Sequence, residues 1–201
     1  PNATSAEEGM AQAKGFEGQL ATFLAACSKN KACEFYNGGK SEAAFDALLL
    51  DLDANPLVVS AERTPVTQGV TFTAVAQAMY SDSYWSYLED ALASAQAGDG
   101  TDLLSLYDEY FQRQADGTYG NELEAFVNIL CADNPDRMTV EEADELVPQY
   151  QANAPRFSPG TTGDYTCVFW PKALDPRIKI TGQGAGPIAP SLAFILAAAT
   201  A

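Results

Sequence analysis

The sequence predicts a mainly α-helical domain that contains one small β-hairpin and ends in a single apolar strand. Apolar residues recur at intervals of three and four along most of the chain, which is the spacing of helices with one buried face. The stretch 56–73 is instead rich in β-branched residues around Pro65 and Gly69, which predicts the hairpin. Residues 191–201, SLAFILAAATA, form a short apolar run that suits a buried strand or a short core helix, and the strand is the structure we predict.

The helical pattern occupies six segments, and because one of them is interrupted we expect roughly six to eight helices. The first begins with a capping box, in which Ser5 is followed three residues later by Glu8. The third is broken near 81–83 and ends at Gly98 and Gly100. The six segments are 4–27, 41–56, 73–100, 101–117, 121–133 and 139–155.

The chain divides into three parts of different character. Residues 1–154 carry the helices and are predicted to form the helical domain. Residues 155–190 are rich in Gly and Pro, which predicts a loop-rich exit segment that carries Cys167 and Trp170. Residues 191–201 are the predicted strand.

The composition excludes several classes of function. The net charge of −16, from 27 acidic and 11 basic residues, argues against partners that are nucleic acids or anionic membranes. It suits solubility, and it also suits a cationic ligand such as a peptide amino terminus. The chain has no His, so it cannot supply a Ser-His or Cys-His pair. No metal-ligand spacing such as an EF-hand loop occurs, and no metal or cofactor is expected.

The four cysteines are even in number, which suggests two disulfides with three possible pairings. Cys27 and Cys33 flank the polar turn SKNKA, which can bring them together. Cys131 and Cys167 would then form the second pair. Disulfides indicate an oxidising compartment. The alternative is four buried free thiols.

Two features are candidates for ligand binding. Asp133 ends the apolar segment 121–133, two residues after Cys131, and could hold a cation where the dielectric constant is low. The alternative is that it only caps the helix. The segment MYSDSYWSYLEDA could provide an aromatic wall for a ligand, with Tyr80 and Trp85 as contacts, or could simply be core.

Five motifs, taken in order, resemble a known family. They are LATFLAACSKNKAC, AMYSDSYWSYLEDAL, NILCAD, TCVFWP and AFILAAATA. Together they cover nearly the whole chain and look like the lid region of secreted bacterial tripeptidyl aminopeptidases. These are serine exopeptidases of the α/β-hydrolase fold, related to proline iminopeptidases. The most specific motifs are Cys-x-Asp at Cys131 and Asp133, and Cys-x-x-Trp-Pro at Cys167, Trp170 and Pro171.

The resemblance implies that the chain is a lid without catalytic residues of its own. In the family the nucleophilic Ser, in a Gly-x-Ser-x-Gly elbow, precedes the lid, and the acid and the His follow it. Residues 191–201 would be a strand of the hydrolase core, and the chain would stop where the family places the acid. The partners would be the rest of the hydrolase chain and a peptide substrate.

The resemblance also assigns roles to single residues. Cys167 would tie the lid exit to Cys131, and Trp170 and Pro171 would direct the chain back to the core. Asp133 would bind the substrate's free ammonium group. The rival interpretation is a stand-alone secreted acidic helical binding module without enzyme activity.

Overall fold

The computed structural model describes residues 4–133, 137–157 and 165–171, and this part of the chain is mainly helical, as predicted. The helices are α1 (Ser5–Lys29), α2 (Ser41–Ala54), α3 (Gln68–Met79), α4 (Trp85–Gln96), α5 (Thr101–Tyr110), α6 (Glu122–Asp133) and α7 (Val140–Asn153), with short 3-10 turns η1 (Asn37–Gly39) and η2 (Asp82–Tyr84). The predicted strand at 191–201 lies outside the described residues. None of the described helices combines the length and the apolarity needed to cross a bilayer.

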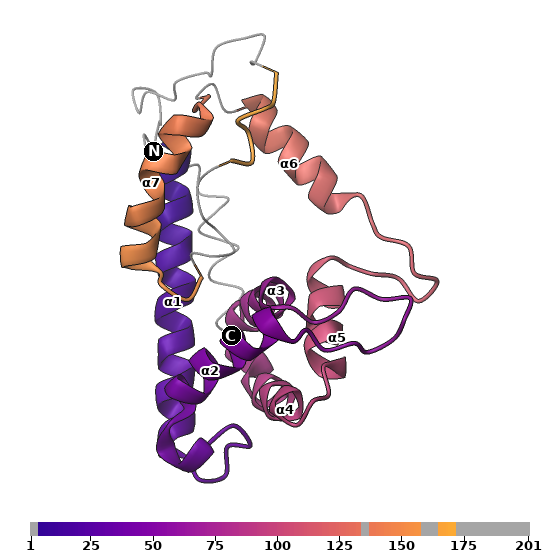
Figure 1. The fold of residues 1–201 in the computed structure, drawn as a ribbon. Coiled ribbons are helices and arrows are strands. Elements are labelled where there is room, and N and C mark those ends of the chain that lie inside the picture. The colour runs from indigo at the N-terminus through magenta and orange to yellow at the C-terminus, as the bar shows by residue number, and fades with distance from the viewer. Residues whose placement is uncertain (1–3, 134–136, 158–164, 172–201) are drawn as a thin grey trace, which may run out of the picture.

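Helix α1 is the longest helix and the axis of the fold (Figure 1). Helix α7 lies along its N-terminal half, while α2 to α5 gather beside its C-terminal half. Helix α6 stands apart from this body in Figure 1, and no other described helix packs extensively against it. The structure is therefore a compact body of six helices with one projecting helix.

The hydrophobic core belongs to the body. Its largest fully buried side chains come from α1 to α5 and from the segments around η1 and after α7, and none comes from α6. They include Leu20, Phe35, Phe45, Leu52, Val75, Leu88, Leu103 and Phe157. Each such side chain contributes roughly 1.5–3 kcal/mol when it leaves water, so the body accounts for most of the folding free energy.

The predicted hairpin is reduced to one antiparallel bridge, between Leu57 and Val66. The two residues exchange both backbone hydrogen bonds, at 3.0 and 2.8 Å. The chain then enters α3 earlier than the pattern predicted, because the Thr67 hydroxyl accepts a hydrogen bond from Val70 N and caps the helix. Val70 and Thr71, two of the β-branched residues that suggested a strand, are buried in α3, so tertiary packing outweighs their local preference.

The capping box of α1 uses Thr4 and Glu7, one residue earlier than the predicted Ser5 and Glu8. Thr4 N donates to Glu7 Oε2 at 2.8 Å, and Glu7 N donates to Thr4 Oγ1 at 3.2 Å. The sequence offers two registers of the same motif because Thr-Ser is followed by Glu-Glu. Thr4 is the residue with extended backbone angles, and this fixes the register.

Glu17 of α1 anchors the chain after α7. Its carboxylate accepts hydrogen bonds from the backbone N–H groups of Arg156 and Phe157, at 3.0 and 3.2 Å. The Arg156 guanidinium also donates to Asp46 of α2 at 2.8 and 3.2 Å, and this bond is the main cause of its raised pKa. Phe157 is thereby held in the core, stacked on Phe16 with ring centroids 5.5 Å apart.

We expect Glu17→Gln to lower the free energy of unfolding by about 1–2 kcal/mol, because it weakens two charge-assisted hydrogen bonds at a side chain that is only 12% exposed. The matched control is Glu42→Gln. Glu42 lies 3.8 Å from the same guanidinium but is 53% exposed, so its loss should cost no more than about 0.5 kcal/mol. Urea denaturation of both variants measures the difference, and equal losses would contradict this role of Glu17.

Candidate binding cavity beside helix α6

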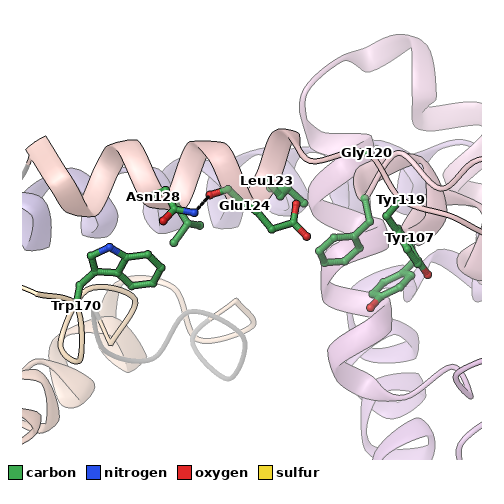
Figure 2. Close-up of a pocket in the computed structure, with 9 residues that line it drawn as sticks. Tyr107, Tyr119, Gly120, Leu123, Glu124, Asn128 and Trp170 are labelled. Carbon is green, nitrogen blue, oxygen red and sulfur yellow. Dashed lines mark hydrogen bonds between the residues drawn. The ribbon is translucent and has the colours of Figure 1, made fainter.

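A cavity of about 470 Å³ lies between the body and α6. It is formed by three segments: the end of α5 with the turn that follows it, one face of α6, and the short segment 165–171 (Figure 2). Its lining residues are Tyr107, Phe111, Tyr119, Gly120, Leu123, Glu124, Val127, Asn128 and Trp170. The lining is therefore aromatic and aliphatic, with a single ionisable carboxylate.

Helix α5 supplies one wall of the cavity. The rings of Tyr107 and Phe111 lie 4.7 Å apart, centroid to centroid, and Phe111 also meets Tyr110 edge-on at 5.2 Å. Burial raises the pKa of Tyr107, and the neighbouring Tyr119 and Asp108 raise it further. Both effects favour the neutral phenol, so this wall carries no charge at neutral pH.

The turn after α5 places Tyr119 over the cavity. Helix α5 ends in a Schellman motif, in which Gln112 N donates to Glu109 O at 3.0 Å and Arg113 N donates to Asp108 O at 2.8 Å. Gln112 has a positive φ of 53°, in the left-handed region where Gly is usual. The helical pattern predicted for 101–117 therefore stops at Tyr110.

After this cap the chain folds back on itself. Gln114 N donates to Thr118 O at 2.8 Å, and Arg113 bridges to Tyr119. The Asp116 carboxylate accepts hydrogen bonds from the Thr118 hydroxyl and N–H, and these bonds lower its pKa. The turn is thus held by its own polar groups rather than by packing on the body.

Helix α6 supplies the opposite wall. Leu123, Glu124, Val127 and Asn128 are spaced so that they share one face, and all four line the cavity. Asn128 Nδ2 donates to the Glu124 carbonyl oxygen at 2.7 Å, the bond drawn in Figure 2. The other faces of α6 are also apolar but exposed, since Phe126 and Ile129 are 59% and 61% accessible.

The C-terminal end of α6 is fastened to segment 165–171. A disulfide joins Cys131 to Cys167, with Cα atoms 5.3 Å apart. Arg137 donates to the carbonyl oxygens of Cys131 and of Pro171, the latter at 2.9 Å. These bonds position Trp170, whose indole forms the end of the cavity below Asn128 in Figure 2.

The other predicted disulfide, Cys27–Cys33, is also present, with Cα atoms 5.4 Å apart, and no cysteine of the chain is free. Glu89 lies near this bond, and its carboxylate and the two sulfur atoms are within 4.8 Å of one another. Because both thiols are consumed by the disulfide, the group does not offer the thiolates that a metal ion would need.

The residues predicted to bind substrate lie outside the cavity and apart from one another. Asp133 is exposed at the last residue of α6. Tyr80 follows α3 and is 60% exposed, with its ring against Phe16 at 5.3 Å. Trp85 is half-buried and packs edge-on against Phe23 at 5.7 Å, so part of the predicted aromatic wall belongs to the core.

Tyr80 is nevertheless connected to the cavity through neighbouring aromatic residues. Burial raises the pKa of Tyr110, and the charge of Tyr80 raises it further. Tyr110 in turn packs on Phe111, which lines the cavity. None of the residues that line the cavity was among the predicted substrate contacts. Glu124 gave no distinct signal, since the pattern of α6 shows only an acidic first turn.

No family model matches the chain. Curated relatives do match it. The chain is 34% identical over 186 residues to a protein named serine protease Hip1 in Mycobacterium tuberculosis (strain ATCC 25618 / H37Rv). It is 32% identical over 183 residues to carboxylesterase B of the same strain and to putative hydrolase Mb2247c of Mycobacterium bovis (strain ATCC BAA-935 / AF2122/97).

These matches support a relationship to serine hydrolases. Each covers 85% of the chain but only 35% or 34% of the relative. The chain therefore spans about a third of the length of the curated relatives it matches.

We expect the double variant Cys131→Ser/Cys167→Ser to loosen α6 while the body stays folded. By loop entropy the bond, which closes a separation of 36 residues, contributes about 3–4 kcal/mol. Hydrogen exchange of the α6 amides should become faster by a factor of about ten or more, while the amides of α3 and α5 stay protected. The control Cys27→Ser/Cys33→Ser should leave α6 exchange unchanged. Unchanged α6 exchange in the first variant would contradict this account.

Proposed function

We propose that the chain is the helical lid of a secreted serine exopeptidase with an α/β-hydrolase core, an enzyme that releases short peptides from free amino termini. The relatives named serine protease and hydrolase support the enzyme class, and the ordered Cys-x-Asp and Cys-x-x-Trp-Pro motifs support the exopeptidase family. The two disulfides support folding in an oxidising compartment.

The observation that carries the proposal is the apolar surface of α6. Phe126, Ile129 and Leu130 are exposed to solvent on α6. A different face of the same helix lines the cavity. Exposed apolar groups gathered on one element mark a surface that another protein surface covers. The remainder of the hydrolase chain is the partner we assign to it, with α6 facing the active site as part of its roof.

The chemistry of bond cleavage belongs to that remainder. The 201 residues contain no His, so a nucleophilic Ser here would have no imidazole to take its proton. The elbow Ser, the acid and the His would come from the segments on either side of the lid. The lid's contribution is to exclude water and to limit the length of peptide that reaches the nucleophile.

Asp133 is the group we propose as the anchor for the substrate's ammonium. Its carboxylate is exposed at the end of α6, and the neighbouring Cys131 is immobilised by the disulfide, so the position is both accessible and fixed. Tyr80 and Trp85 are proposed as further substrate contacts. Because Tyr80 directly follows α3 and Trp85 begins α4, these contacts require that the core brings the substrate across the body of the lid.

A second candidate function is a secreted acidic binding module that works without an enzyme. The cavity favours it, because its aromatic and aliphatic lining is suited to holding a ligand. If the chain as it occurs naturally is found to bind a ligand without any hydrolase core attached, the result supports the binding module and not the lid.

We expect the purified 201-residue chain to have no peptidase activity, because it lacks the imidazole that activates a serine. A chromogenic tripeptide with a free amino terminus measures turnover, and a fluorophosphonate probe tests for an activated serine. Turnover by the chain, together with labelling of one of its serines, would exclude the proposed division between lid and core.

In the complete enzyme we expect Asp133→Asn to lower kcat/KM by about 10- to 100-fold for substrates with a free amino terminus, because the ammonium loses its counter-charge. Substrates with an acetylated amino terminus are the control and should lose much less. Equal losses for both kinds of substrate would make Asp133 a structural residue.

A further inference from the structure

We propose that the cavity beside α6 binds the basic side chain of a peptide, an arginine or a lysine, with Glu124 as its counter-charge. In this cavity the carboxylate of Glu124 lies between aromatic rings at the two ends. Figure 2 shows the carboxylate of Glu124 directed along α6 toward Tyr107 and Tyr119, with Trp170 at the opposite end of the cavity.

The walls match the chemistry of such a side chain. Cations bind favourably over the faces of Trp and Tyr rings, and guanidinium groups also stack on them. The aliphatic stem of a lysine or arginine can pack against apolar groups, which Leu123 and Val127 provide. The volume of about 470 Å³ lies within the range of roughly 300–1,000 Å³ that is common for small-ligand sites.

The electrostatics also favour a cation. Within the described part of the chain, the Glu124 carboxylate forms no ion pair, and two of the bases near the cavity are engaged elsewhere. Arg63 pairs with Asp108, and Arg137 donates to two backbone carbonyl groups. An anionic side chain would meet Glu124 without a compensating charge, in a chain of net charge −16.

This site is distinct from the proposed ammonium anchor. Glu124 and Asp133 are nine residues apart on α6, which places them ~13 Å apart along the axis and on opposite sides of the helix. One group of a ligand cannot contact both carboxylates. The inference rests on the proposed function only in naming a peptide as the ligand, and the binding itself can be measured on the chain alone.

The test is a titration of the ¹⁵N-labelled chain followed by NMR. The chain has 2 Trp residues, so Trp170 in the cavity reports binding. Trp85 packs on Phe23 and is proposed to meet substrate only when the hydrolase core is present, so in the isolated chain it is an internal control. The probe is Nα-acetyl-arginine amide, which has a basic side chain and no terminal charge. We expect it to shift the Trp170 indole signal and to leave the Trp85 signal in place.

Two further probes separate the possible causes of binding. Nα-acetyl-citrulline amide has nearly the same shape as the first probe but no charge, and alanine amide has an ammonium group but no basic side chain. Both probes should bind more weakly than the arginine probe, by a factor of about five or more. Equal affinity for citrulline would show that charge is not recognised, and equal affinity for alanine amide would make the cavity an ammonium site. Either result overturns the proposal.

The variants identify the carboxylate and the cavity. Glu124→Gln should weaken binding of the arginine probe about three- to tenfold, whereas Glu145→Gln, the same change on an exposed residue of α7, should not. Val127→Phe fills the cavity and should abolish the Trp170 shift while the Trp85 signal keeps its position.

Unchanged affinity in Glu124→Gln, or binding that persists in Val127→Phe, overturns the proposal. Failure of the lid proposal would appear instead as peptidase turnover by the chain, which these binding measurements do not involve.

Discussion

The covalent bond between Cys131 and Cys167 is the constraint on which the functional part of this structure depends. Helix α6 contributes no residue to the hydrophobic core, so packing alone does not hold it. The disulfide and the two hydrogen bonds of Arg137 fix its C-terminal end, and the turn after α5 leads directly into its N-terminal end. With both ends fixed, α6 can present apolar side chains to a partner and still form one wall of a cavity.

The fold separates stability from recognition. The body gains its stability from side chains buried between α1 and α5, and the ion pairs of Arg156 join the chain after α7 to it. Helix α6 and segment 165–171 lie outside that core. A surface that must meet another surface cannot also be buried, so these apolar residues add little to the stability of the isolated chain and are available for binding.

The acidic character of the chain has a local meaning as well as a general one. With 27 acidic and 11 basic residues, most carboxylates cannot find a basic partner. Among the residues that the structure describes, three carboxylates surround Arg156, whereas Glu124 has no ion pair and lies beside the aromatic residues of the cavity. A site of this kind attracts cations at long range through the net charge and selects them at short range through the rings.

The sequence by itself predicted most of the helices, their inward faces and the Cys27–Cys33 bond, because the helical period and the close spacing of these two cysteines are local signals. The Cys131–Cys167 bond joins residues 36 apart, and its prediction rested on elimination and on the family resemblance. It also placed the end of α4 correctly, since Gly98 marks it, with a φ of 93°. Helix α5 ends in the same kind of cap at Gln112, which gives no such signal. The β-branched residues of α3 misled the prediction because burial, not local preference, decided their conformation. Only the tertiary structure revealed Glu124 as a cavity residue, because the turn after α5 folds Tyr107 and Phe111 back to face α6 and because Trp170 comes from a segment far from α6 in the sequence.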